Sequence, residues 1–101
     1  MLEESPKAFL DHLAVEKGAS PHTVAAYRND LTQLTEYVGG AHRDARRVSE
    51  WAQVDHKMLG NYVVTLYDRG YSATTVARKI ASIKSFFGYL AEEGQVSDDP
   101  T

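Results

Sequence analysis

The chain has 101 residues and no cysteine, 43% of its residues are hydrophobic, and its formal net charge is −3 at pH 7. These figures predict one small folded domain, and they exclude a two-domain enzyme, a disordered chain, disulfides, cysteinyl metal sites and a cysteine nucleophile. The negative charge also argues against nucleic-acid binding, because domains that bind nucleic acids are usually basic.

The first helix is expected over residues 5–17. Pro6 fits its first turn, where a proline removes no helical hydrogen bond, and Gly18 ends it. Its apolar positions are Phe9, Leu10 and Leu13. These three side chains form a narrow stripe, so the helix needs a partner surface.

The second helix is expected over residues 20–38. Ser20 is a typical N-cap, Pro21 fits the first helical position, and the Gly39-Gly40 pair ends the helix. Apolar side chains recur every three or four residues, at Val24, Tyr27, Leu31, Leu34 and Val38. This spacing places them on one face, which predicts an amphipathic helix packed on a core.

The connection between the second and third helices follows no regular pattern. It begins with a polar stretch, residues 41–47, that contains three arginines and is expected to form a loop. Trp51 and Val54 are expected to anchor the end of this connection in the core. A short helical turn is expected near residues 49–53.

Two further helices follow the same design. The third begins after the N-cap Asp55 and ends at Gly70, and the fourth begins after the N-cap Ser72 and ends at Gly94. The apolar face of the third consists of Leu59, Tyr62, Val63 and Leu66. The fourth has the most regular stripe, at Val76, Ile80, Ile83, Phe87 and Leu90. No useful strand-like alternation occurs, so the fold class is predicted to be an all-α bundle of four main helices.

The sequence is expected to contain neither a membrane helix nor an N-terminal signal peptide. No apolar run approaches the roughly 20 residues of a membrane helix, and the first residues lack a signal-peptide pattern. A cytoplasmic protein without membrane contact is therefore expected. Residues 95–101 are polar and acidic and are expected to begin a linker.

The net charge is unevenly distributed along the chain. Residues 72–91 carry three bases and no acid, whereas residues 92–101 carry four acids and no base. At 100° per residue, the positions opposite the apolar stripe of the fourth helix are Thr74, Arg78, Ser82 and Ser85, with Thr75 and Lys79 beside them. A face of hydroxyls and bases is typical of a surface that contacts phosphates, and a merely solvated helix face is the alternative.

The second helix offers an uncharged version of such a face. Its outward positions are His22, Ala26, Asn29 and Gln33. Ser20 and Thr23 lie at its N-terminus, where backbone amides and the helix dipole favour an anion. The alternative is that Ser20 caps the helix and binds no ligand.

No pattern in the chain indicates catalysis or a bound metal. The four histidines, His12, His22, His42 and His56, lack the spacings of metal-binding histidines. Glycine-rich phosphate loops and nucleophile motifs are absent, and the adjacent acids near the C-terminus would point apart on a helix. No catalytic residue, metal ligand or cofactor is therefore predicted.

Four stretches have a recognisable order and spacing: FLDHL (9–13), SPHTVAAYRNDL (20–31), LYDRGYS (66–72) and TVARKIASIKSFFGYL (75–90). With them the chain resembles the N-terminal core-binding domain, a SAM-like domain, of the tyrosine recombinases, the family of phage integrases and Xer-type proteins. The Asp99-Pro100 pair is similar to the Asn-Pro junction that leads into the catalytic domain of that family.

The resemblance implies a definite architecture and partner. It implies an orthogonal bundle over residues 1–94 that forms one half of a clamp around double-stranded DNA and contacts other recombinase protomers in a synaptic complex. Residues 95–101 would lead to the catalytic domain that holds the Arg, Lys, His and nucleophilic Tyr. Without that domain the chain itself is not expected to be an enzyme, and the isolated domain is expected to be monomeric.

The resemblance also implies which residues face DNA. On the second helix they are Ser20, His22, Thr23, Ala26 and Asn29. On the fourth helix they are Thr74, Thr75, Arg78, Lys79, Ser82 and Lys84. Two features depart from the family pattern: the connection over residues 39–54 is longer than in compact members, and Asp99 stands where Asn is usual.

Two other functions are compatible with the sequence. A helical protein–protein interaction module would use the apolar stripe of the first helix, and its binding would be insensitive to the charges of the fourth helix. A free-standing DNA-binding regulator would use the same bundle, and its gene would end near residue 101.

Overall fold

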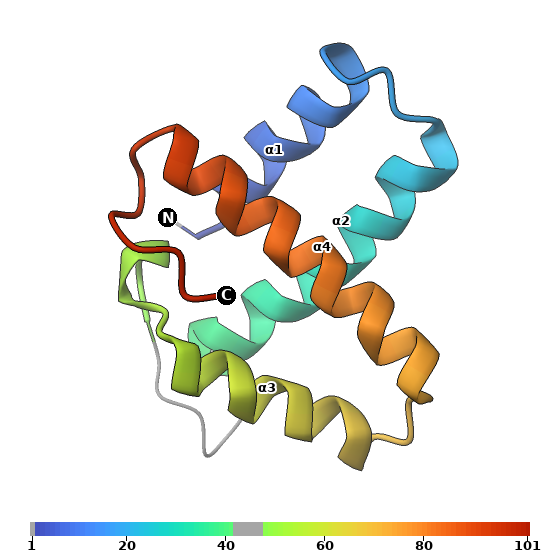
Figure 1. The fold of residues 1–101 in the computed structure, drawn as a ribbon, viewed down its shortest axis with the longest axis vertical. Helices are drawn as coiled ribbons and strands as arrows, with labels where there is room; N and C mark the ends of the chain where they lie inside the picture. The colour runs from blue at the N-terminus through green and yellow to red at the C-terminus, as the bar shows by residue number, and fades with distance from the viewer. Residues whose placement is uncertain (1, 42–47) are drawn as a thin grey trace.

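The computed structural model describes residues 2–41 and 48–101, and in these ranges it contains helices and no strand. The elements are α1 (Glu4–Val15), α2 (Pro21–Glu36), a π-helical turn η1 (Tyr37–Ala41), a 3-10 turn η2 (Trp51–Gln53), α3 (His56–Asp68) and α4 (Ala73–Glu92). Figure 1 shows α4 lying across α2, and α4 packs on all three other α-helices. The predicted all-α bundle of four main helices is confirmed.

Three of the four α-helices begin at the predicted caps. The side chains of Ser20, Asp55 and Ser72 each accept a hydrogen bond from the backbone amide three residues later, at 3.2, 2.8 and 3.2 Å. Each bond satisfies one of the amides that have no partner inside the helix. The local signals therefore placed these helix starts correctly.

The start of α1 differs slightly from the prediction. It begins at Glu4, one residue early, and Glu3 precedes it without a side-chain cap. The hydroxyl of Ser5 donates instead to Oε1 of Gln95, at 2.6 Å, near the other end of the chain. A tertiary contact has thus taken the side chain that would otherwise be free to cap.

α2 ends in the π-helical turn η1 rather than in an ordinary α-helical terminus. The chain continues through η1, in which Gly40 has a φ of +100°, a conformation that side chains other than glycine rarely adopt. After residues 42–47, which lie outside the described residues together with the predicted arginine-containing loop, the amide of Val48 donates to the carbonyl of Val38, at 2.9 Å. The end of the connection that the structure describes, at Val48, therefore lies beside the C-terminal end of α2, where the connection begins.

The core is centred on α4. Its side chains Val76, Ile83, Phe86, Phe87 and Leu90 are all at most 4% exposed. They pack with buried residues of α1, α2 and α3 in one cluster that also contains Trp51 and Val54, as predicted for the end of the connection. The indole of Trp51 donates to the carbonyl of Leu2, at 2.8 Å, and so ties the N-terminus to this cluster.

The acidic C-terminal segment lies against the bundle. Val96 is buried, and the imidazole Nδ1 of His56 lies 3.0 Å from the carbonyl of Pro100. The division into a domain over residues 1–94 and a linker from residue 95 stays a prediction. None of the helices in the described ranges is long and apolar enough to cross a membrane.

Tyr62 is a polar exception in the core. It is 2% exposed, its ring packs on that of Tyr37, and its hydroxyl oxygen has no hydrogen-bond partner among the described residues. Burial raises the pKa of this phenol far above its usual value, and the nearby carboxylate of Asp30 adds to the rise. The hydroxyl is therefore held neutral.

Tyr62→Phe is expected to leave the free energy of unfolding at neutral pH unchanged or to raise it by about 1 kcal/mol, because the lost hydroxyl has no partner. The phenol pKa is higher in the folded than in the unfolded chain, so the parent loses stability as the pH rises above about 10. The variant lacks this loss at Tyr62. Urea unfolding at neutral and alkaline pH measures both effects, and a variant clearly less stable than the parent would contradict them.

Candidate nucleic-acid interface

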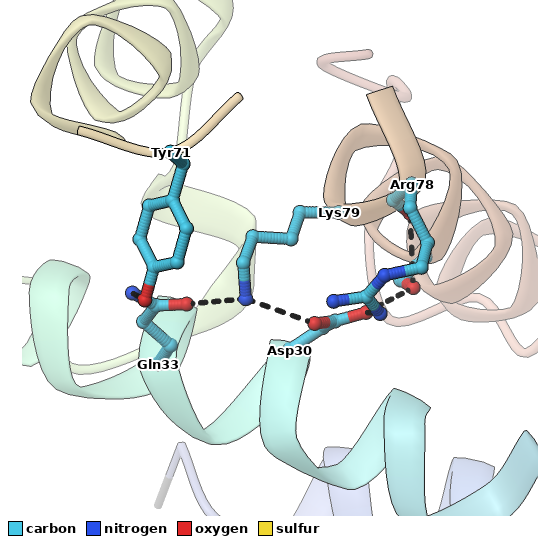
Figure 2. A network of polar contacts seen from close by, with 6 residues as sticks. Asp30, Gln33, Tyr71, Arg78 and Lys79 are labelled. Carbon is cyan, nitrogen blue, oxygen red and sulfur yellow. Dashed lines mark hydrogen bonds and ion pairs between the residues drawn. The ribbon is translucent and has the colours of Figure 1, made fainter. Parts of the chain in front are cut away.

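A buried carboxylate lies where α2 and α4 cross. Asp30, in the middle of α2, is 1% exposed, and three side chains of α4 donate to it. Its Oδ2 accepts hydrogen bonds from Arg78 Nη1 at 2.6 Å and Ser82 Oγ at 2.7 Å, and its Oδ1 accepts from Lys79 Nζ at 3.1 Å. Figure 2 shows this network between the two helices. A charge buried in this way is tolerated because it is paired and hydrogen-bonded.

Lys79 is as deeply buried as the acid that it pairs with. It is 2% exposed, and its ammonium also donates to Oε1 of Gln33, at 2.8 Å. The same ammonium lies 5.0 Å from the ring centroid of Tyr71, whose hydroxyl accepts from Nε2 of Gln33. Figure 2 shows the side chains of Asp30, Gln33 and Tyr71 grouped around the Nζ atom of Lys79. Its charge is therefore satisfied inside the protein.

The outward orientation predicted for Lys79 and Ser82 is wrong. Both are 2% exposed and face α2. The reason is that α4 packs on three helices, so its buried arc is wider than the apolar stripe suggests. Since side chains three and four residues apart share a helix face, Lys79 lies on the same face as Val76 and Ile83.

The sequence did contain a signal for this pairing. Asp30 stands three residues after Tyr27 and four before Leu34, which places an acid on the apolar face of α2. Lys79 stands three residues after Val76 and four before Ile83, which places a base on the apolar face of α4. An acid and a base on the inward faces of two helices indicate that the helices meet there, because buried charges are normally paired.

The other residues assigned to DNA contact lie at or near the surface. Those on α2 and before it are exposed: Ser20, His22, Thr23, Ala26 and Asn29. On α4, Thr74, Arg78 and Lys84 are exposed and Thr75 is half-buried. Their positions are compatible with contact to a ligand, and the contact itself stays a prediction.

Lys84 lies apart from the α2–α4 crossing. It lines an apolar groove between α3 and α4 together with Leu59, Ile83 and Pro100. The structure thus places Lys84 on the side of α4 that faces α3, whereas Arg78 contacts α2. The two exposed cations of α4 do not form one patch.

The N-termini of α2 and α4 have the same local geometry. Ser20 and Ser72 each cap their helix, and each hydroxyl donates to the hydroxyl of the threonine three residues later, Thr23 or Thr75, at 3.1 Å. Both N-termini lie on the right-hand side of Figure 1. The capping role of Ser20 that the sequence left open as an alternative is confirmed.

The positive and negative charges at the crossing of α2 and α4 do not balance. One carboxylate lies between two cations, so the group of Asp30, Arg78 and Lys79 has a net charge of +1. Lys79 is enclosed, whereas the side chain of Arg78 is 47% exposed. The unbalanced positive charge therefore reaches the solvent through Arg78.

The apolar stripe of α1 forms no external surface. Phe9 is 3% and Leu10 8% exposed, and Leu13 packs against the core cluster. The interaction module that the sequence allowed would have used these residues. Among the residues that the structure describes, no group of three acids or histidines could hold a metal ion.

Comparison with known proteins identifies the family. Residues 7–94 match the model of the phage integrase, N-terminal SAM-like domain. Over 100 residues, 99% of its length, the chain is 42% identical to a tyrosine recombinase XerC of Roseiflexus castenholzii and covers 30% of that protein. Over 92 residues, 91% of its length, it is 37% identical to a tyrosine recombinase XerD of Bradyrhizobium diazoefficiens and covers 27% of it. No solved structure matches the chain significantly.

The chain thus spans less than a third of the length of these relatives. The family match nevertheless includes α1 from Lys7 onward, the whole of α2, α3 and α4, and the crossing of α2 and α4. The chain belongs to the family of phage integrase N-terminal SAM-like domains.

Proposed function

We propose that this chain is the DNA-binding N-terminal domain of a site-specific tyrosine recombinase, and that it contacts double-stranded DNA through the exposed faces of α2 and α4. The relatives named tyrosine recombinases support the assignment. DNA cleavage and rejoining would belong to the part of the protein outside this chain. Neighbouring recombinase protomers are the second expected partner.

The distribution of acids supports the DNA-binding face most directly. Residues 20–35 and 72–91 together contain one acid, Asp30, and it is 1% exposed and paired with two bases. A phosphate backbone that approached these two ranges would meet hydroxyls, amides and exposed bases such as Arg78. The exposed acids of the two helices, Glu36 and Glu92, stand at their C-terminal ends. The net charge of −3 is therefore no obstacle, because repulsion between exposed charges falls off within about 10 Å at moderate salt.

The docking would combine two kinds of contact. Thr23, Thr74 and Arg78 are suited to phosphates, which position a protein on DNA without reading its sequence. His22, Ala26 and Asn29 are suited to base edges in the major groove, which is wide enough to admit a helix. Any preference for a base sequence would come from these three positions.

Arg78→Ala is expected to weaken binding of this chain to a mixed-sequence DNA duplex by about tenfold, the value of one charge-assisted hydrogen bond. It should also reduce the slope of log K against log salt by about one. Fluorescence anisotropy titrations at several salt concentrations measure both quantities.

Lys7→Ala serves as the control for Arg78→Ala. It also removes one positive charge, but Lys7 lines the groove between α1 and α2. It should leave the salt slope unchanged. A parent chain that does not bind duplex DNA, or an equal loss of binding in Arg78→Ala and Lys7→Ala, would refute the proposed face.

A further inference from the structure

We propose that Asp30 is a positioning residue for DNA binding: it holds the guanidinium of Arg78 at the α2–α4 crossing in the orientation that a phosphodiester accepts. This inference rests on the proposed function and deepens it. It assigns to a buried acid a favourable effect on the affinity for a polyanion.

The geometry of Arg78 allows it to bind both groups at once. Its Nη1 donates to Oδ2 of Asp30 at 2.6 Å, while nearly half of its side chain is exposed. A guanidinium has five N–H donors in a planar fork, so a contact through Nη1 leaves donors for an anion outside the protein. Figure 2 shows the guanidinium resting on the carboxylate.

The acceptor of that bond is itself held in place. Ser82 and Lys79 donate to the same carboxylate from successive turns of α4, at 2.7 and 3.1 Å. Asp30 is therefore fixed from the side of α4 by three donors, and it cannot turn away when an anion approaches. An arginine that is already ordered loses less conformational freedom when it binds a phosphate than a freely moving one.

Lys79 keeps the acid from opposing the phosphate. It lies on Oδ1 and compensates the charge of Asp30 from inside the protein. The charge of Arg78 therefore remains available to a ligand, although Arg78 is bonded to a carboxylate. The buried pair and the exposed base have separate tasks: Asp30 and Lys79 form a neutral support, and Arg78 is the ligand-binding group.

Charge alone and positioning predict opposite results for the loss of Asp30. If only charge mattered, removing an acid near the phosphates would tighten DNA binding. If Asp30 positions Arg78, removing it weakens binding. The sign of the change therefore separates the two accounts.

The test uses Lys79→Met as its reference, because removing Asp30 alone would leave a buried ammonium without its partner. Asp30→Asn in the Lys79→Met background is expected to weaken binding to a mixed-sequence duplex about threefold to tenfold. The same substitution should have no effect on binding when Arg78 is also replaced by alanine. Circular dichroism checks that each variant remains folded.

A measurement without DNA tests the positioning directly. The {1H}-15N nuclear Overhauser effect of the Arg78 Nε–H group should indicate an ordered side chain in the Lys79→Met chain and a mobile one after Asp30→Asn. If Asp30 had a purely structural role, its loss would affect the DNA affinity equally in chains with and without Arg78.

Arg78→Lys is a further variant that leaves the buried pair intact. It keeps the positive charge but lacks the planar fork, so it should bind DNA several times more weakly than the parent. The inference alone would be overturned if Arg78→Lys bound like the parent, or if the folded Asp30→Asn, Lys79→Met chain bound as well as Lys79→Met. Failure of the parent chain to bind duplex DNA would overturn the proposed function as well.

Discussion

Asp30→Ala is expected to lower the free energy of unfolding by about 3–5 kcal/mol, the usual cost of removing one partner of a buried ion pair. The substitution leaves the ammonium of Lys79, 2% exposed, without its carboxylate, and it removes the acceptor of Ser82 and Arg78. Since small domains are stable by only about 5–15 kcal/mol, the loss should be visible as a much lower midpoint in urea.

The second substitution that tests this result is Lys79→Met. In the chain that already carries Asp30→Ala, it should restore a large part of the lost stability, because no buried charge is then left unpaired. Lys79→Met alone should cost much less than Asp30→Ala, since Asp30 keeps Arg78 and Ser82 as donors. If the double variant were as unstable as Asp30→Ala, the ion pair would not be the cause of the loss.

Phe86→Ala is expected to lower the free energy of unfolding by about 3–5 kcal/mol, because it leaves a large cavity. Phe86 is fully buried, and its ring meets those of Phe9, Trp51 and Phe87 at centroid distances of 5.6, 4.8 and 5.5 Å. It thus joins α1, η2 and α4. Urea or thermal unfolding followed by circular dichroism measures the effect.

Val64→Ala provides the matched control for Phe86→Ala. Val64 lies on α3 and is 57% exposed, so its truncation should change the stability by less than about 0.5 kcal/mol. A loss of similar size in both variants would contradict the central position of Phe86. The sequence stripe of α4 had included Phe87 but not Phe86, so this experiment also tests what the structure added.

The helices could be predicted from the sequence because their signals are local. A hydroxyl or carboxylate at Ser20, Asp55 or Ser72 bonds an amide three residues later, whatever the rest of the chain does. The apolar stripes were equally readable, because one period of the helix decides which side chains share a face. The start of α1 was less accurate, since Ser5 contacts Gln95, ninety positions away.

The candidate site could be predicted only in part. Exposed positions such as Asn29, Thr74 and Arg78 follow from the helical period, and the structure agrees with it there. The period does place Lys79 beside Val76 and Ile83, and its burial agrees with that position. Ser82 lies further from the apolar stripe and is buried because α4 packs on three helices. The period gives an angle around one helix, but the number of neighbours decides how much of the circumference is buried.

The amino-acid sequence by itself determined the fold class, the three capped helix starts and the uneven distribution of charge along the chain. Only the tertiary structure decided which of these charges remain at the surface. Asp30 and Lys79 are 49 residues apart in the sequence and form a buried ion pair where α2 crosses α4. Arg78, the residue before Lys79, remains exposed together with its charge. The physical reason is that burial of a charge requires a partner of opposite sign, and only the crossing of two helices brings that partner within reach.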